Sequence, residues 1–132
     1  MVLLGLKPQM CIKPLEVDVF VSRPIKTSGS WEYSIVNNVV KAMRKFETAT
    51  FLGELAVSKC LFITFYLDIG SNIGMYSVVV AAIKRQVVAV DADPVNLAYV
   101  RKSLDLSNNT QNVKIIYNSV RCSGIHIKPF ES

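Results

Sequence analysis

Leu67-Asp-Ile-Gly-Ser-Asn-Ile-Gly74 is the stretch of sequence that decides the fold. An apolar run, residues 61–67, comes before Asp68, and another apolar run opens after Gly74. Two glycines four residues apart, placed between two such runs, are typical of a buried strand, a tight loop and the start of a helix. The sequence therefore predicts a strand, a glycine loop and a helix in this order.

A second predicted strand, residues 86–90, ends in Asp91, which follows Gly70 by 21 residues. A glycine loop after one strand and a carboxylate after the next can hold a nucleoside, because the carboxylate can bind the ribose hydroxyls. Asn72 stands where a dinucleotide-binding loop has its second glycine. Its side chain obstructs the close approach of a pyrophosphate, which disfavours NAD and FAD.

The loop residues have distinct expected roles. Gly70 can take a positive φ and let the backbone pass close to a ligand, and Gly74 is expected to let the helix approach a strand closely. Asp68 is expected to point into the crevice at the strand end and attract a cationic amino acid moiety. The first N–H groups of the helix lack intrahelical acceptors and can face the ligand. The alternative is that the glycines only form a tight turn and that Asp91 is a solvated carboxylate.

Upstream of the loop, residues 17–21 alternate between apolar and polar at their start and are rich in β-branched side chains. This pattern predicts a strand that ends before Pro24 and is followed by a loop at 27–30. Ser30 is expected to cap the next helix, with Glu32 in its first turn. Apolar residues at helical spacing predict that this helix ends near residues 46–50.

Downstream, the pattern predicts helices at 74–84 and 94–106, a turn at 107–110 and a strand at 113–117. Asp93 is expected to cap the helix that begins at Pro94. Strands that alternate with helices favour an α/β fold with a parallel sheet. The continuous apolar character of 61–67 predicts a central strand covered on both faces.

Composition narrows the classes of protein. The 132 residues are 51% hydrophobic and 19% charged, which predicts a packed core. The net charge is +5, but the lysines and arginines are scattered along the chain and form no basic cluster. No nucleic-acid partner is therefore expected. The three cysteines, Cys11, Cys60 and Cys122, show neither metal-ligand nor disulfide spacing and favour a reducing compartment such as the cytoplasm. The longest apolar stretch, 56–67, is too short for a membrane segment.

No catalytic residue can be named from the sequence. His126 is the only histidine and lies in a tail without a regular pattern. Three aromatic residues, Trp31, Tyr33 and Tyr76, are expected in the core or at its rim. Tyr76 directly follows the loop, so flanking the pocket is an alternative for it.

The stretch from Leu67 through Ser77 resembles the first motif of class I S-adenosylmethionine-dependent methyltransferases, and is closest to the FkbM type. Residues 87–96 resemble the second motif, in which Asp91 would bind the ribose hydroxyls in place of the more usual Glu. Residues 113–120 resemble the third strand, which would bring Asn118 near the adenine. The resemblance runs from about residue 17 to residue 120. The first motif is the part most specific to this family.

The resemblance implies methyl transfer from S-adenosylmethionine to an oxygen of a small molecule or sugar. It assigns cofactor binding to six residues, Asp68, Gly70, Asn72, Gly74, Asp91 and Asn118. It implies a Rossmann-like, doubly wound sheet, divided here into a leading segment, 1–50, and a cofactor-binding half-domain, 51–132.

The family's sheet has seven strands, so the C-terminal half of the fold is expected to be missing from this chain. A truncated or misassembled gene product would explain that difference. Two alternatives stay open: a non-catalytic fragment of such an enzyme, and a fragment of an NAD-binding oxidoreductase. An exposed sheet edge would favour self-association.

Overall fold

The computed structural model of the chain describes residues 5–45, 51–52 and 65–119. Its elements, in chain order, are α1 (Ser22–Ser28), α2 (Tyr33–Lys45), β1 (Phe51–Leu52), β2 (Phe65–Ile69), α3 (Met75–Ala82), β3 (Gln86–Asp91), α4 (Pro94–Leu106), the 3-10 helix η1 (Thr110–Asn112) and β4 (Val113–Tyr117).

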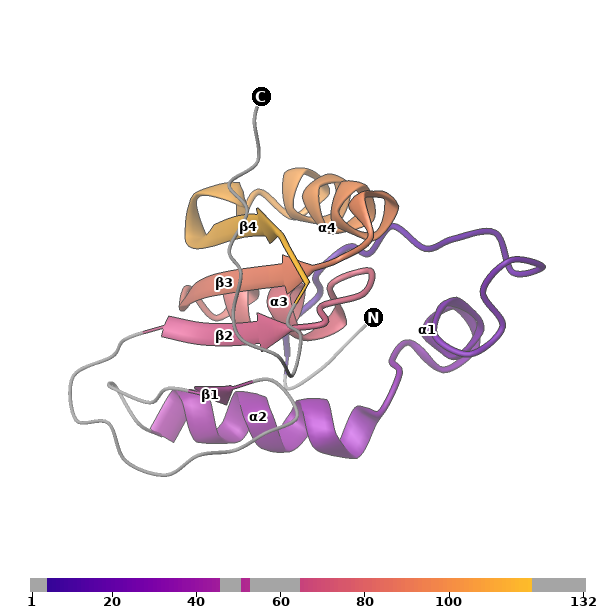
Figure 1. Ribbon diagram of the computed structural model, residues 1–132. Coiled ribbons are helices and arrows are strands. Elements are labelled where there is room, and N and C mark those ends of the chain that lie inside the picture. The colour runs from indigo at the N-terminus through magenta and orange to yellow at the C-terminus, as the bar shows by residue number, and fades with distance from the viewer. Residues whose placement is uncertain (1–4, 46–50, 53–64, 120–132) are drawn as a thin grey trace.

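The described residues form a parallel sheet in the order β1-β2-β3-β4 (Figure 1). The register pairs Asp68 of β2 with Ala89 of β3, and Asp91 of β3 with Tyr117 of β4. The predicted α/β fold with a parallel sheet and flanking helices is therefore confirmed. Because the strands are parallel, their carboxyl ends lie at one edge, where the glycine loop begins. Self-association through a sheet edge stays a prediction.

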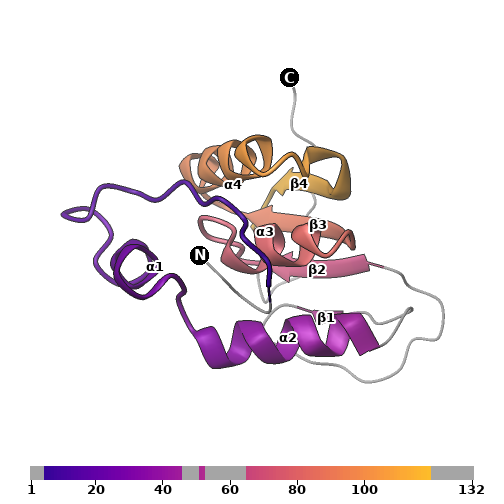
Figure 2. The ribbon, with the colours of Figure 1, turned by 180° about the vertical axis from the view of Figure 1, so that it is seen from behind.

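Helices cover one face of the described sheet, with α3 and α4 behind the strands in Figure 1 and in front of them in Figure 2. On this face Tyr66, Val87 and Ala89 are buried and join the core cluster with α3 and α4. The alternate positions, such as Val88 and Val90, are only half-buried. Among the described elements, the expected helical cover on both faces is therefore not found.

The two helices after the glycine loop were predicted well. α3 is apolar almost all round, and its residues from Met75 to Ala81 are buried except for Tyr76. α4 starts at Pro94, and the Val95 N–H donates to Asp93 Oδ1 over 2.9 Å. This hydrogen bond confirms the predicted Asp93 cap. Proline suits the first helical position because it has no N–H that would need an acceptor there.

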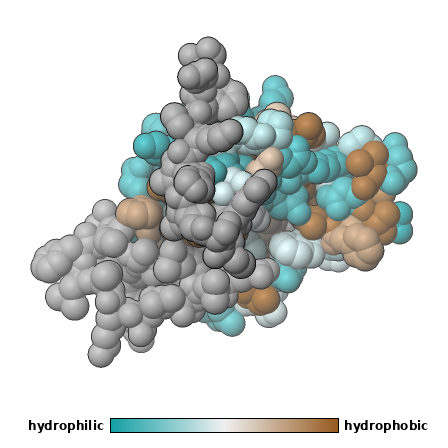
Figure 3. All heavy atoms as spheres, in the orientation of Figure 1, coloured by the Kyte–Doolittle hydropathy of each residue, from teal (hydrophilic) through white to brown (hydrophobic). Residues whose placement is uncertain are grey.

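The predicted strand at 17–21 is wrong. These residues form turns that lead into α1, and Val17 and Phe20 are 70% and 84% exposed. Asp18 lies before the helix, and its carboxylate accepts the N–H groups of Val21 and Ser22, where α1 begins, each over 3.0 Å. Figure 3 shows hydrophobic residues at the right-hand end of the molecule, where α1 and the preceding turns lie in Figure 1.

The expected cap of α2 is also wrong. The helix begins at Tyr33, and the Ser30 hydroxyl donates to the Trp31 carbonyl instead of accepting a helical N–H. Glu32 lies just before the helix with φ of 49°, and its carbonyl accepts from Ile35 and Val36. Predictions for 46–50, 61–64, Cys60, Cys122 and His126 lie outside the described residues.

Within the described part of the chain, none of the helices has the length and apolar character needed to cross a membrane.

Candidate functional site

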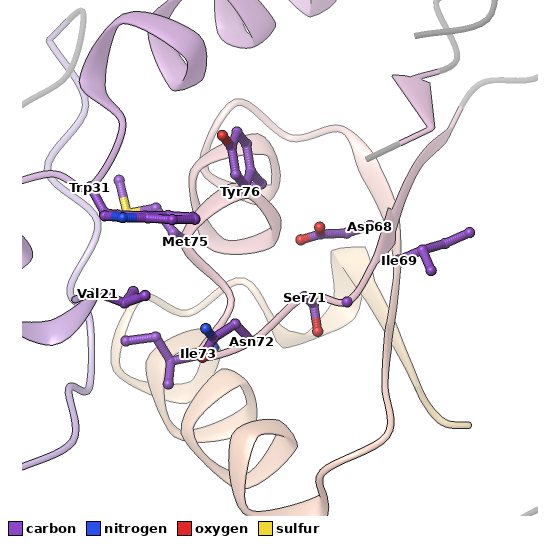
Figure 4. A pocket seen from close by; sticks show the side chains of 10 residues that line it. Val21, Trp31, Asp68, Ile69, Ser71, Asn72, Ile73, Met75 and Tyr76 are labelled. Carbon is purple, nitrogen blue, oxygen red and sulfur yellow. The ribbon is translucent and has the colours of Figure 1, made fainter. Parts of the chain in front are cut away.

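A cavity of about 260 Å³ opens beside the glycine loop, at the carboxyl end of β2 (Figure 4). The loop and the first turn of α3 supply most of its wall, and the N-terminal segment supplies the rest. Its lining residues are Val21, Trp31, Asp68, Ile69, Gly70, Ser71, Asn72, Ile73, Met75 and Tyr76. Three of the six predicted cofactor-binding residues, Asp68, Gly70 and Asn72, thus lie on one cavity. Tyr76 also lines the cavity, which was the alternative left open for it.

Asp68 is a buried carboxylate on the cavity wall, only 4% exposed. Its Oδ2 accepts the N–H of Ser77 over 3.1 Å and the Ser77 hydroxyl over 2.5 Å. Burial raises the pKa of Asp68 to about 6; the bonds from Ser77 oppose that rise, and the charge of Asp91 adds to it. A carboxylate desolvated to this degree is stabilised by any positive charge that enters the cavity.

The backbone N–H groups of the loop are already used within the protein. Gly70 and Ser71 both donate to the Val90 carbonyl, over 2.8 and 3.0 Å. The next N–H groups, those of residues 72, 73 and 74, donate to Asp91 Oδ2, Asn72 Oδ1 and the Ser71 carbonyl. The N–H groups of residues 70–74 are therefore not free for a ligand. The expectation for the first N–H groups of the helix concerns α3, which begins at Met75, and stays a prediction. A phosphate would need such donors, whereas a cation would not.

Asp91 holds the loop instead of lining the cavity. Its Oδ2 accepts the Asn72 N–H over 2.7 Å, and its Oδ1 accepts the Asp93 N–H over 2.8 Å and the Asn96 amide over 3.2 Å. A carboxylate offers about four acceptor positions. Three are taken by these donors, which leaves room on Oδ2 for a single hydroxyl donor.

Asn72 occupies its position in the loop with φ of 50°. Asparagine tolerates this left-handed conformation better than most residues with a side chain, because its short polar side chain can hydrogen-bond locally. Here Asn72 Oδ1 accepts the Ile73 N–H over 2.8 Å. The side chain thus stabilises the loop while its residue lines the cavity.

The two glycines serve different purposes. Gly70 has φ of +73°, and an added Cβ would meet nothing within 4 Å, so the backbone here borders open space. Gly74 has φ of +86°, and a Cβ there would lie 2.8 Å from Cγ2 of Val100. Gly74 therefore allows α3 to begin against α4, and the close approach is to a helix instead of a strand.

Asn118 follows β4 and does not line the cavity. Its N–H donates to the Asp91 carbonyl over 2.9 Å, and its Oδ1 accepts the Ser119 N–H over 2.7 Å. The structure thus brings the backbone of Asn118 to the end of β3, beside the residue expected to bind a ribose.

Ser71 and Trp31 line the cavity but were not predicted there. Ser71 is 5% exposed, and its buried hydroxyl has no hydrogen-bond partner among the described residues. Buried polar groups are normally satisfied, so this hydroxyl is available to a ligand. A small polar residue between the two glycines was the only sequence signal for Ser71.

Trp31 approaches the cavity from the segment between α1 and α2. Its ring contacts the Tyr76 ring edge to face, with centroids 6.5 Å apart and an angle of 79° between the planes. The Tyr76 hydroxyl donates to Glu32 Oε2 over 2.7 Å. Trp31 is 45 residues from Tyr76, so no local pattern could reveal this arrangement.

Within the described ranges, no group of three His, Cys, Asp or Glu side chains comes together to hold a metal ion. Comparison of the chain with protein-family models, curated proteins and solved structures finds no match.

Proposed function

We propose that this chain binds S-adenosylmethionine and acts as an FkbM-like class I methyltransferase on an oxygen of a small molecule or sugar. The observation that carries the proposal is the buried Asp68 carboxylate on the wall of the cavity beside the glycine loop. A perturbed carboxyl group in a cavity is a frequent mark of a functional site.

The charge of the site favours this ligand over a dinucleotide. S-adenosylmethionine carries a positive sulfonium and a positive ammonium group, and both would be stabilised beside Asp68. A pyrophosphate would instead meet the carboxylates of Asp68 and Asp91 and find the loop N–H groups 70–74 already donating within the protein. The oxidoreductase alternative is therefore disfavoured by charge as well as by the side chain of Asn72.

The order of the strands also supports the proposal. β2, β3 and β4 are neighbours in chain order, which is the arrangement of the first three strands in a Rossmann-like, doubly wound sheet. In that arrangement the ligand crosses the carboxyl ends of the strands, from Asp68 at β2 toward Asp91 at β3. The open acceptor position on Asp91 Oδ2 suits one ribose hydroxyl.

The cavity itself fits only part of the cofactor. Its volume of about 260 Å³ is just below the range of roughly 300–1,000 Å³ found for small-molecule pockets. We assign it to the amino acid and sulfonium end, next to Asp68 and Ser71.

When bound, S-adenosylmethionine supplies an activated methyl group for in-line displacement by an oxygen nucleophile. The contribution of this chain is to orient the cofactor through Asp68 and the loop. Positioning of this kind can supply on the order of several kcal/mol of the rate enhancement without a covalent intermediate.

Calorimetric titration of the full chain with S-adenosylhomocysteine and with NADH tests the proposal. We expect binding of the first only. Gly70→Val should abolish it, because the new side chain would enter the open space beside the loop. Gly5→Val is the matched control, since Gly5 has a similar φ of +80° and equally open surroundings but does not line the cavity.

Each other outcome has a defined meaning. Unchanged affinity in Gly70→Val would refute the assignment of the loop. Binding of NADH alone would favour an oxidoreductase, and binding of neither ligand would favour a non-catalytic fragment.

A further inference from the structure

We propose that Glu32 and Tyr76 hold Trp31 as an aromatic wall of the cavity, and that this wall and Asp68 together select a positively charged ligand over a neutral ligand of similar shape. Figure 4 shows Trp31 on one side of the cavity and Asp68 on the other. The choice of ligand rests on the proposed function, whereas the hold on Trp31 can be tested with no ligand at all.

The 29–32 segment has an unusual backbone. Gly29 has φ of 77° and Glu32 has φ of 49°, so two left-handed residues enclose Ser30 and Trp31. Glutamate seldom adopts this conformation, and it persists only where surrounding contacts determine it. The segment brings Trp31 to the cavity wall instead of continuing either neighbouring helix.

One hydrogen bond joins the 29–32 segment to the glycine-loop side of the cavity. The Tyr76 hydroxyl donates to Glu32 Oε2 over 2.7 Å, across 44 residues of sequence. A bond to an ionised acceptor is stronger than one between neutral groups. It fixes Glu32 in its left-handed conformation, and with it the adjacent Trp31, whose ring also contacts Tyr76.

The resulting wall is chemically suited to a cation. The faces of indole and phenol rings carry negative potential and attract positive groups, and both rings line the same cavity as the buried Asp68 carboxylate. Tyr76 and Glu32 are thus positioning residues, and Trp31 is a residue that would determine specificity.

S-adenosylmethionine and S-adenosylhomocysteine form a matched pair of probes, because they differ by one methyl group and one positive charge. We expect the wild-type chain to bind the charged ligand more tightly. Trp31→Leu should reduce this preference about two- to fivefold, whereas Trp31→Phe should retain most of it. An unchanged ratio of the two affinities in Trp31→Leu would overturn the selection of a cation, and so would failure of the wild type to bind either ligand.

The hold on Trp31 has a separate readout, because Trp31 is the only tryptophan in the chain. We expect Tyr76→Phe and Glu32→Ala to increase quenching of its fluorescence by acrylamide, at unchanged helical content by circular dichroism. Glu32→Gln keeps an acceptor for Tyr76 and should restore the wild-type quenching. Tyr33→Phe is the control, since the Tyr33 side chain is 53% exposed and does not line the cavity.

Equal quenching in the wild type and Tyr76→Phe would overturn the positioning role. Increased quenching together with an unchanged ratio of affinities would keep that role and overturn the selection. Failure of the proposed function alone would appear as loss of binding with the fluorescence differences intact.

Discussion

Asp68 is ionised at neutral pH in a site where burial disfavours the ionised form. Its pKa of about 6 lies above the ordinary value of 3.8, so the folded protein holds the proton more tightly than the unfolded chain. Stability from this group is therefore greatest at low pH and is lost as the pH rises through 6. By the same argument, a bound cation would lower the pKa and recover the lost stability.

Asp68→Asn should show this pH dependence directly. Because the amide does not ionise, the stability of the variant relative to the wild type should rise, by up to about 3 kcal/mol, as the pH increases from about 4 to 7. Chemical denaturation across this range gives the measurement. A constant difference between the two proteins would show that Asp68 is not desolvated.

Asp18→Asn should show the opposite slope. Burial alone would raise the pKa of Asp18, but the hydrogen bonds from Ser22 and Val21 outweigh it and hold the pKa below 3.8. The stabilisation by the Asp18 carboxylate is therefore present above pH 3.8 and is lost as the pH falls through its lowered pKa. Relative to the wild type the variant should lose about 0.5–2 kcal/mol near neutral pH and much less in acid.

Gly74 and Gly70 make a second contrast between single residues. Both have positive φ, but only Gly74 has Val100 within 2.8 Å of an added Cβ. Gly70→Ala should lower the free energy of unfolding by about 1–2 kcal/mol through backbone strain, and Gly74→Ala by about a further 1–3 kcal/mol through overpacking. Equal losses in thermal denaturation would show that α4 yields to the extra methyl group.

The sequence predicted three cavity residues of the glycine loop, and missed Ser71 of the same loop and the residues that reach the cavity from elsewhere. Asp68, Gly70 and Asn72 share one local motif, so their proximity follows from chain connectivity. Trp31 meets Tyr76 through tertiary packing, and its position depends on the left-handed Glu32. Single-sequence patterns contain neither kind of information.

Among the elements, those around the loop were predicted to within one or two residues at most ends. Each of β3, α4 and β4 has a clear pattern of apolar residues, and α4 also begins with a proline. For these elements the local sequence signals agree with the tertiary structure. α1 was missed because alternation at 17–21 favours a strand and Pro24 was taken as its end. Pro24 instead lies in the first turn of α1, where a missing N–H costs nothing.

The glycine loop keeps its shape through the end of β3. Asp91 accepts three donors there, from Asn72, Asp93 and Asn96. Asp91→Asn replaces one acceptor oxygen by a donor and leaves at least one of these N–H groups unsatisfied. The variant should be destabilised by about 1–3 kcal/mol, and the Asn72 N–H should exchange faster with solvent.

Asp105→Asn is the control for this effect, because Asp105 is exposed and accepts one hydroxyl, that of Thr110. An unchanged denaturation midpoint in Asp91→Asn would mean that the loop does not depend on this carboxylate. Affinity for S-adenosylhomocysteine should fall in parallel with the stability, since the same carboxylate is expected to bind the ribose.

In the molecule as a whole, the parallel sheet places the ends of β2 and β3 side by side, and the core fixes them there. Buried residues of α2, α3 and α4 join the strands in the core, so the loop between β2 and α3 is held at both ends. The N-terminal segment closes the outer side of the cavity through Val21 and Trp31.

The most direct test of the account is the pKa of Asp68, measured from its side-chain carboxyl carbon by NMR, with and without S-adenosylmethionine. The account predicts a pKa of about 6 in the free protein and a value below the ordinary one when the cationic ligand is bound. A pKa of Asp68 that the ligand does not move would contradict the central claim.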